Sequence, residues 1–252
     1  MCLIVFAWQP GHSQPLILAA NRDEFFPRPC LAAAPWPDAP GIIAGRDLQA
    51  GGTWLGLGPE GRFAALTNIR DLSLPQGERS RGDLPVEFLR GSHTPEQYLH
   101  EVAEQHQLYG GFNLLVGDQN ELWHFNSKSA VINRLKAGVY GVSNADLNTP
   151  WPKLERAKRA LKNALPTSDP IALFNLLNDS QRAADEELPQ TGISLEMERM
   201  LSSVFIASTG YGTRASTVLT AHADGSRIMH ERSYGPDGVF LGEVRIEYPL
   251  QG

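Results

Sequence analysis

The sequence predicts an α+β fold in one domain, with two mostly antiparallel sheets covered by helices. Two features support this prediction. Short apolar segments typical of strands fill the first and last parts of the chain, and helix signals cluster in the middle. No repeat or low-complexity linker divides the 252 residues, and a length of this order suits one large domain. We therefore expect residues 1–252 to form a single domain.

The predicted strands are short, and turn signals such as Asp118-Gln119-Asn120 and Asp224-Gly225 separate them. Short strands joined by tight turns are typical of antiparallel pairing. The first strand is apolar on both faces, which predicts a central and buried position. The predicted strands span residues 2–8, 16–21, 53–58, 63–68, 112–116, 121–126, 131–135, 139–143, 204–208, 216–221, 227–233 and 243–248.

Three helices are predicted in the middle of the chain. A capping box at Thr94 and Gln97, with proline between them, predicts a helix that runs to about residue 107. In residues 151–165 the apolar residues form one stripe, and five basic residues, Lys153 among them, are assigned to a solvated face. Asp169, which precedes a proline, caps a third helix that ends near residue 177.

Two segments are predicted to be loops. Residues 27–40 are rich in proline but contain a cysteine, a tryptophan and three consecutive alanines, which predicts an ordered loop that crosses the surface. Residues 178–198 are polar and acidic, which predicts a mobile loop.

Composition excludes several classes of protein. The balance of 22 basic and 28 acidic residues argues against a general nucleic-acid surface. Two cysteines cannot form a disulfide scaffold. No two histidines have H-x-x-x-H spacing, and no histidine lies near a cysteine at zinc-ligand spacing, so no metal site is predicted. No apolar run reaches the roughly 18 residues of a membrane span, so we expect no stable membrane insertion and a cytoplasmic location. The expected partner is a small-molecule substrate or ligand, and the sequence specifies no oligomeric state.

Cys2 is the first candidate for chemistry. If Met1 is removed, Cys2 carries both a thiol and a free α-amine, whose pKa near 7.7–8.0 lets it accept a proton at about neutral pH. This places nucleophile and base in one residue, the arrangement of N-terminal nucleophile hydrolases. The alternative is that Cys2 is a small buried apolar residue.

The string Asn21-Arg22-Asp23-Glu24 follows an apolar strand. Four adjacent polar residues at a strand end are too costly to bury without partners. In an extended chain Asn21 and Asp23 point to one face, and Arg22 and Glu24 to the other, so one face can serve a site. Asp23 is the natural partner of an α-ammonium at Cys2. The alternative is an ordinary charged edge between strand and loop.

These motifs resemble the NRDE family, also called the transport and Golgi organisation protein 2 family. The resemblance runs in order from residue 1 to about residue 220. It implies a fold similar to N-terminal nucleophile hydrolases, an αββα sandwich in which two packed sheets lie between helix layers. The resemblance rests on MCLIVFAW, AANRDEFFPRP, AGRDLQAGGTWLGL, GRFAALTNIRD, SRGDLP, GGFNLLVGD, VYGVSNADLNTPWPKLERA and YGTRASTVL.

The order of polar landmarks is also similar to cysteine amidases of the choloylglycine hydrolase and penicillin V acylase type. This more distant resemblance implies hydrolysis of a C–N bond that is not a peptide bond. Here an arginine and an aspartate are adjacent, so in a strand they cannot both face Cys2, and we expect Asp23 rather than Arg22 to act there. The positions that match are Cys2, Arg22, Asp23, Asn68, Asn144 and Arg214.

The resemblance to these amidases implies a role for each catalytic candidate. Cys2 attacks a carbonyl carbon, and Asp23 orients the α-amine. Asn68 and Asn144 donate hydrogen bonds to the oxyanion. Arg214 stabilises Cys2 as a thiolate.

A pocket beside these residues is expected to be lined by Asn21, Arg22 and Trp54, although Trp54 alternatively belongs to the core. Gly51-Gly52 predicts a tight turn or a close approach of two backbones. The family resemblance also implies a different function, the handling of haem by a non-catalytic chaperone or trafficking factor. Haem is then a carried ligand, no cofactor is required, and the sequence does not identify a haem-ligating residue.

Overall fold

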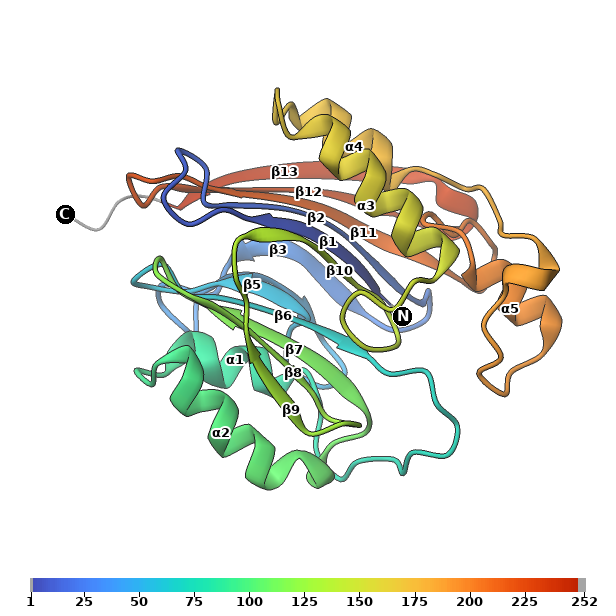
Figure 1. The fold of residues 1–252 in the computed structure, drawn as a ribbon, viewed down its shortest axis with the longest axis horizontal. Coiled ribbons are helices and arrows are strands. Elements are labelled where there is room, and N and C mark those ends of the chain that lie inside the picture. The colour runs from blue at the N-terminus through green and yellow to red at the C-terminus, as the bar shows by residue number, and fades with distance from the viewer. Residues whose placement is uncertain (1, 249–252) are drawn as a thin grey trace.

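Two antiparallel sheets, one of six strands and one of seven, pack face to face in the computed structural model, which describes residues 2–248 (Figure 1). In spatial order the first sheet consists of β10 (Gly138–Val142), β1 (Cys2–Trp8), β2 (Leu16–Phe25), β11 (Tyr211–Ala221), β12 (Arg227–Tyr234) and β13 (Phe240–Tyr248). The second sheet consists of β3 (Cys30–Pro35), β4 (Ile43–Asp47), β5 (Leu55–Leu57), β6 (Phe63–Asn68), β7 (Phe112–Gly117), β8 (Leu122–Asn126) and β9 (Val131–Arg134).

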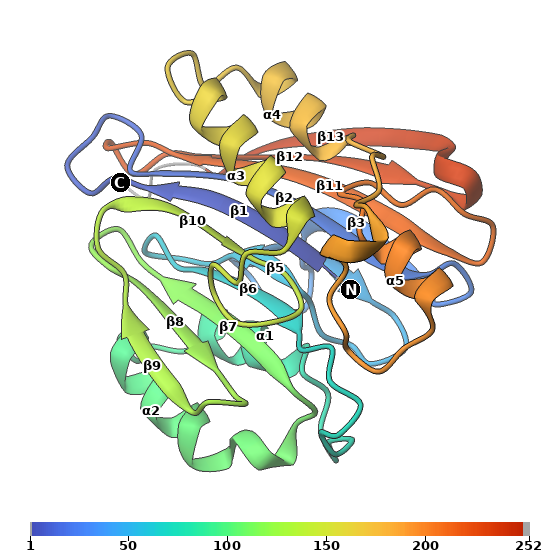
Figure 2. The ribbon, with the colours of Figure 1, turned by 45° about the vertical axis from the view of Figure 1, so that its right-hand side comes forward.

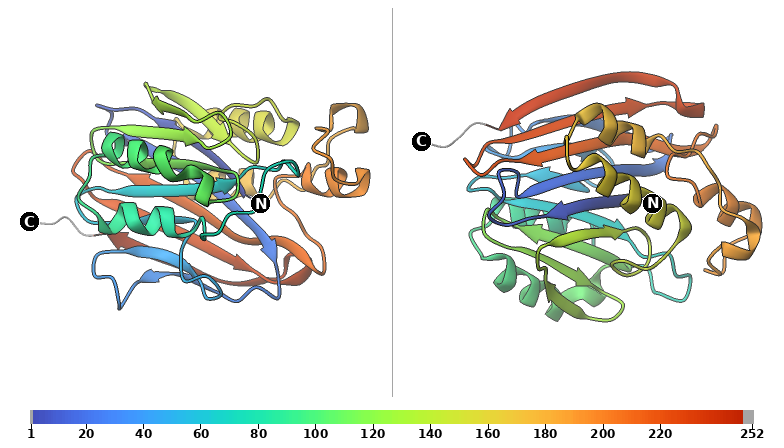
Figure 3. Two further views of the ribbon diagram at one scale, coloured as in Figure 1. Left: turned by 90° about the horizontal axis from the view of Figure 1, so that it is seen from below. Right: turned by 45° about the horizontal axis from the view of Figure 1, so that its top comes forward.

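Helices cover the outer face of each sheet, which gives four layers (Figure 2). α3 (Pro152–Ala164) and α4 (Pro170–Leu177) lie on the first sheet. α1 (Asp83–Arg90) and α2 (Pro95–Gln105) lie on the second, and α5 (Leu195–Leu201) lies at one end of the molecule (Figure 3). The predicted helix–sheet–sheet–helix order is therefore confirmed. Within residues 2–248, no helix combines the length and the apolar character needed to cross a bilayer.

β1 is buried along its whole length, as its apolar faces predict, but it lies second from the edge of the first sheet, between β10 and β2, rather than at the centre. Cys2, Ile4 and Phe6 face the second sheet and join the core between the sheets. Leu3 and Val5 face α3 and α4 and join the outer core. Full burial of each large apolar side chain stabilises the fold by about 1.5–3 kcal/mol. Both faces thus fix the strand, and with it the position of Cys2.

Two helix starts follow the predicted capping. The Thr94 hydroxyl accepts a hydrogen bond from the Gln97 backbone N–H at 3.2 Å, and the Gln97 side chain accepts one from the Thr94 N–H at 3.1 Å. The Asp169 carboxylate accepts a hydrogen bond from the Ile171 N–H at 3.0 Å. Each interaction satisfies a backbone donor at a helix start.

The prediction of a continuous loop over residues 27–40 is wrong, because β3 lies within it. β3 is the edge strand of the second sheet, where proline and residues of low strand propensity are tolerated because one side needs no backbone pairing. Its partner β4 was also not predicted, because alanine, glycine and charged residues obscure the pattern.

The strand predicted over residues 204–208 is absent, although Val204, Phe205 and Ile206 are buried. Their backbone donors bond to the Asp179 carbonyl and the Thr213 hydroxyl instead of to a neighbouring strand. α1 and α5 were not predicted. α1 begins after a glycine that makes no side-chain cap, and α5 is a short helix that begins inside the segment predicted to be a loop.

Candidate active site

Cys2 begins β1 and its side chain reaches a pocket between the sheets. The residue is 8% exposed, and its carbonyl accepts a hydrogen bond from the Ser143 hydroxyl at 3.0 Å. Burial raises the pKa of the Cys2 thiol above its usual range, and this effect is opposed by the Arg22 charge and by the Asp23 backbone N–H. The thiol is therefore protonated at neutral pH, and a base must accept its proton before it can attack.

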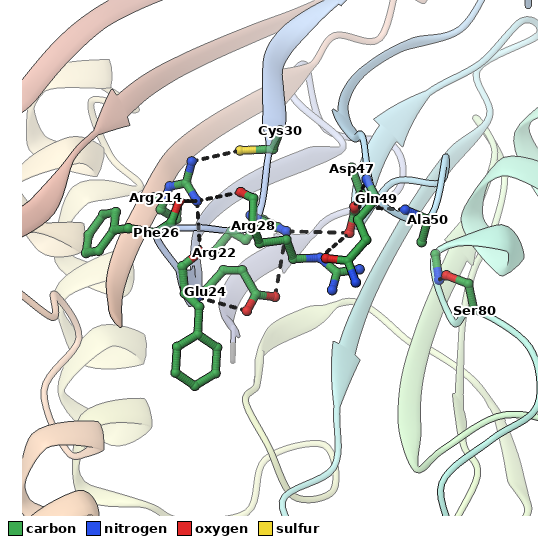
Figure 4. A network of polar contacts seen from close by, with 12 residues as sticks. Arg22, Glu24, Phe26, Arg28, Cys30, Asp47, Gln49, Ala50, Ser80 and Arg214 are labelled. Carbon is green, nitrogen blue, oxygen red and sulfur yellow. Dashed lines mark hydrogen bonds and ion pairs between the residues drawn. The ribbon is translucent and has the colours of Figure 1, made fainter. Parts of the chain in front are cut away.

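Arg22 lies directly opposite Cys2 in the antiparallel register, so both side chains point to the same face of the sheet. The prediction that Asp23, rather than Arg22, shares this face is wrong, because the register could not be known from either strand alone. Figure 4 shows Arg22 beside Glu24 and Asp47, with its Nη2 at 3.8 and 3.9 Å from their carboxylates. Its buried Nη1 has no hydrogen-bond partner within the described part of the chain. Arg22 is thus a cation adjacent to Cys2.

Asp23 points to the outer face, beneath the helices. Its Oδ1 accepts a hydrogen bond from the Thr213 hydroxyl at 2.7 Å, and the residue is 1% exposed. Burial raises its pKa, while the charge of nearby Lys153 lowers it. The predicted contact between Asp23 and a free α-amine depends on removal of Met1, which lies outside the described residues.

Lys153 is buried, so its assignment to a solvated face is wrong. It lies on the same stripe of α3 as Ala157 and Leu161, four and eight residues further on, and this spacing was the signal available in the sequence. A buried ion pair lies in the same region, with Arg70 Nη2 at 2.9 Å from Glu198 Oε2. Asp23 and Glu198 both favour the protonated form of Lys153. These side chains form a buried polar layer behind the strand that carries Cys2, and sequence reasoning missed this layer.

The structure brings together the two predicted oxyanion donors, Asn68 and Asn144. The side-chain amide of Asn144 donates to the Asn68 carbonyl at 3.0 Å and to Asn68 Oδ1 at 3.1 Å. Asn144 is fully buried, whereas Asn68 lies in the pocket wall. In this arrangement Asn144 holds the Asn68 amide in position, and the Asn68 NH₂ group is the one available to a ligand.

Arg214 lies in the same pocket, but it contacts Cys30 rather than Cys2. Arg214 occupies a bulge of β11, where the register shifts between Thr213 and Ala215. Its Nη1 donates to the backbone carbonyls of the turn after β2, and its Nη2 lies 3.2 Å from the Cys30 sulfur (Figure 4). The expected partnership of Arg214 with Cys2 is therefore corrected: Arg214 orders this turn, and Arg22 is the cation at Cys2.

The pocket has a volume of about 750 Å³, and Cys2, Arg22, Asn68 and Trp54 are in its wall. Trp54 also packs in the core between the sheets, so both alternatives for this residue hold. Asn21 does not line the pocket; it is buried under the helices, where its amide donates to two backbone carbonyls at 2.8 and 2.9 Å. No histidine lines this pocket, and no cluster that could hold a metal ion occurs within residues 2–248.

One wall of the pocket is shaped by a close backbone approach. A Cβ at Gly52 would lie 2.4 Å from the carbonyl carbon of Gly82, so only glycine fits at this crossing. The adjacent Thr53 N–H donates to the Gly82 carbonyl at 3.1 Å. This contact positions Arg81, another residue of the pocket wall that was not predicted.

Residues 1–236 match a family described as Transport and Golgi organisation 2. The chain belongs to this family. It is 36% identical over 280 aligned residues to the human Transport and Golgi organization protein 2 homolog, with full coverage of both chains. The family predicted from the sequence motifs is therefore confirmed.

Solved structures similar to this Transport and Golgi organisation 2 family member support the predicted fold. The mutant C2A conjugated bile acid hydrolase from Clostridium perfringens superposes with a TM-score of 0.56 at 9% identity, covering 98% of this chain and 92% of that one. The Caenorhabditis elegans ortholog of N-acylethanolamine-hydrolyzing acid amidase gives 0.52 at 12% identity, covering 86% and 92%. At these identities the likeness shows the fold alone, which is that of N-terminal nucleophile hydrolases.

Proposed function

We propose that this protein hydrolyses a C–N bond, other than a peptide bond, in a small molecule, with Cys2 as the nucleophile. The observation that carries the proposal is the position of Cys2, whose thiol lies in the wall of a large pocket opposite a buried arginine. Because β1 is packed on both faces, the thiol is held in one place for attack. Asn68, which Asn144 orients, supplies an amide donor in the same pocket.

The proposed reaction begins after Met1 is removed. The α-amine of Cys2 takes the proton of the thiol, and the sulfur attacks the carbonyl carbon of the substrate. The carbonyl oxygen becomes an oxyanion that accepts a hydrogen bond from the Asn68 amide. When the C–N bond breaks, the amine leaves with the proton from the α-ammonium, which Asp23 orients. Water then hydrolyses the thioester, which releases a carboxylic acid and restores the thiol.

The similar structures support this class of reaction. One is named as a hydrolase of conjugated bile acids and the other as an acid amidase. The name of the first also shows that its second residue is a cysteine in the parent protein. The shared fold and the shared position of a cysteine favour an amidase over an unrelated chemistry.

The amidase proposal is tested by competition between the two cysteines for an acyl chloromethyl ketone, followed by peptide mass spectrometry. Both thiols line the same pocket, and Cys30 is the more exposed, so access alone favours Cys30. We expect Cys2 to be modified faster, because acyl recognition and an adjacent base act at Cys2. Slow and equal modification of both cysteines would overturn the proposal.

A second candidate function is that of a carrier for haem or another amphipathic ligand. The observation that favours it is that the pocket wall contains both apolar and charged side chains. Leu31 and Leu241 are 56% and 66% exposed there, and Arg22 is buried beside them in the same wall. A ligand with an apolar body and an acidic edge matches these side chains. The test is a haem titration followed by absorbance. This function predicts saturable binding that survives Cys2→Ala, and binding no tighter than that of an unrelated acidic protein would contradict it.

A further inference from the structure

Two arginines near Cys2, Arg22 and Arg81, have no carboxylate at close ion-pair distance among the described residues. Arg22 approaches carboxylates only at 3.8 and 3.9 Å, and its buried Nη1 has no hydrogen-bond partner within residues 2–248. Arg81, in the segment before α1, donates from Nη1 to the Gly111 carbonyl at 3.2 Å and has no ion pair among the described residues. Buried or half-buried cations without close counterions are costly in a folded protein.

The other arginines of the pocket have close partners. Arg28 lies 2.6 Å from Asp47, and Arg79 lies 2.8 Å from Glu87. Arg214 is hydrogen-bonded to carbonyls and to Cys30, and Arg46 lies 2.7 Å from an aspartate. Arg22 and Arg81 are therefore the arginines of the pocket that can still bind an anion, and both lie near Cys2.

We infer that Arg22 and Arg81 bind a carboxylate group of the molecule that Cys2 attacks, an inference that rests on the proposed function. The guanidinium group is planar and matches the two oxygens of a carboxylate. The charge of Arg81 interacts with both Cys2 and Glu24, so these groups lie near one another. Burial lowers the pKa of Arg81, and an anionic ligand would offset the cost of that burial.

The neighbouring acids favour a group with a single negative charge. Glu24 faces the two arginines, and Asp47 is already paired with Arg28, so about one positive charge remains for a ligand. A monoanionic carboxylate satisfies this balance, whereas a dianion would face repulsion from Glu24. The substrate class is thus an amide that carries a carboxylate within a few bonds of the reacting carbonyl.

The inference is tested with two alkylating reagents of similar size, iodoacetate and iodoacetamide, which differ in charge. In a Cys30→Ser protein Cys2 is the only thiol, and the ratio of its two alkylation rates cancels its intrinsic reactivity. Glutathione gives the reference ratio for a thiol in water. We expect the iodoacetate-to-iodoacetamide ratio at Cys2 to exceed the reference by about tenfold or more, because hydrogen bonds to charged groups are among the stronger ones.

Matched variants identify the residues responsible. Arg81→Gln keeps a donor near the Gly111 carbonyl and should bring the ratio back toward the glutathione value. Arg79→Gln, which removes a nearby arginine already paired with Glu87, should leave the ratio high. A ratio at Cys2 equal to that of glutathione would overturn the carboxylate site while leaving Cys2 as a nucleophile.

If neither reagent modifies Cys2, the proposed function is contradicted, and the carboxylate site is then tested separately. In a Cys2→Ala protein, N-acetylglycine and its uncharged amide are titrated while the indole N–H signal of Trp54 is followed by NMR. The inference predicts a saturable shift with N-acetylglycine that Arg81→Gln removes. Equal responses to both compounds would overturn it.

Discussion

Lys153 offers a quantitative test of the buried polar layer behind Cys2. Burial lowers its pKa to about 8, from 10.5 for a lysine in water. Its Nζ has no hydrogen-bond partner within the described residues. Between these two values the unfolded chain binds more protons than the folded protein, so the free energy of unfolding rises with pH. The cost of burying the ammonium is fully present below about pH 8 and is relieved as the pH approaches 10.5.

The size of this effect follows from the difference in pKa. A lowering from 10.5 to about 8 corresponds to about 3 kcal/mol over the whole window, because each unit of pKa difference is worth about 1.36 kcal/mol. From about pH 7 to about pH 9.5 the linkage relation gives a rise of about 2 kcal/mol. Lys153→Met removes the titrating group, so the free energy of unfolding of wild type relative to this variant should rise by that amount.

The assay is urea unfolding followed by tryptophan fluorescence at several pH values. Lys162→Met is the matched control, because it removes an exposed ammonium from the same helix. We expect the difference in the free energy of unfolding between wild type and Lys162→Met to change little with pH. A constant difference in the free energy of unfolding between wild type and Lys153→Met from about pH 7 to about pH 9.5 would mean that Lys153 is not desolvated, and would exclude this effect.

Three further predictions follow from other buried groups. Burial lowers the pKa of His124 to about 4, so stability should fall by up to about 3 kcal/mol as the pH drops from 6.5 to 4, and urea unfolding of His124→Gln should lack this loss. Asn144→Ala should cost about 1–3 kcal/mol in the same assay, because it removes both hydrogen bonds to Asn68; an unchanged urea midpoint would contradict this. Gly52→Ala should lower the free energy of unfolding by about 1–3 kcal/mol, because the new Cβ overlaps the Gly82 backbone. Gly210→Ala, whose Cβ meets open space, should change it by less than about 0.5 kcal/mol. Equal effects of the two substitutions would exclude the close approach of Gly52 to Gly82.

Local patterns predicted much of the fold. β1 was predicted correctly because both of its faces are apolar over seven residues, a pattern typical of a strand buried on both sides. The start of α2 was predicted correctly because a capping box is a contact between neighbours in sequence. β3 could not be predicted in the same way, because its residues make a strand only through pairing with β4.

The candidate site was less predictable, because it depends on which strands are neighbours and in what register. The sequence identified Cys2 and the polar string Asn21-Arg22-Asp23-Glu24, which lies in the last part of β2. The register between β1 and β2 decides that Arg22 rather than Asp23 shares the face of Cys2. Likewise, the bulge in β11 directs Arg214 toward Cys30. Both features arise from contacts between distant segments, which a single sequence does not specify.

Whether Cys2 is an N-terminal nucleophile is best tested by the intact mass of the protein purified from its own host, before and after a brief pulse of iodoacetamide. We expect Met1 to be absent and one adduct to form, which peptide mapping assigns to Cys2. A protein that keeps Met1 and leaves Cys2 unmodified would exclude Cys2 as the nucleophile, because the base that activates the thiol would be missing. The carrier function would then be the better explanation of the pocket.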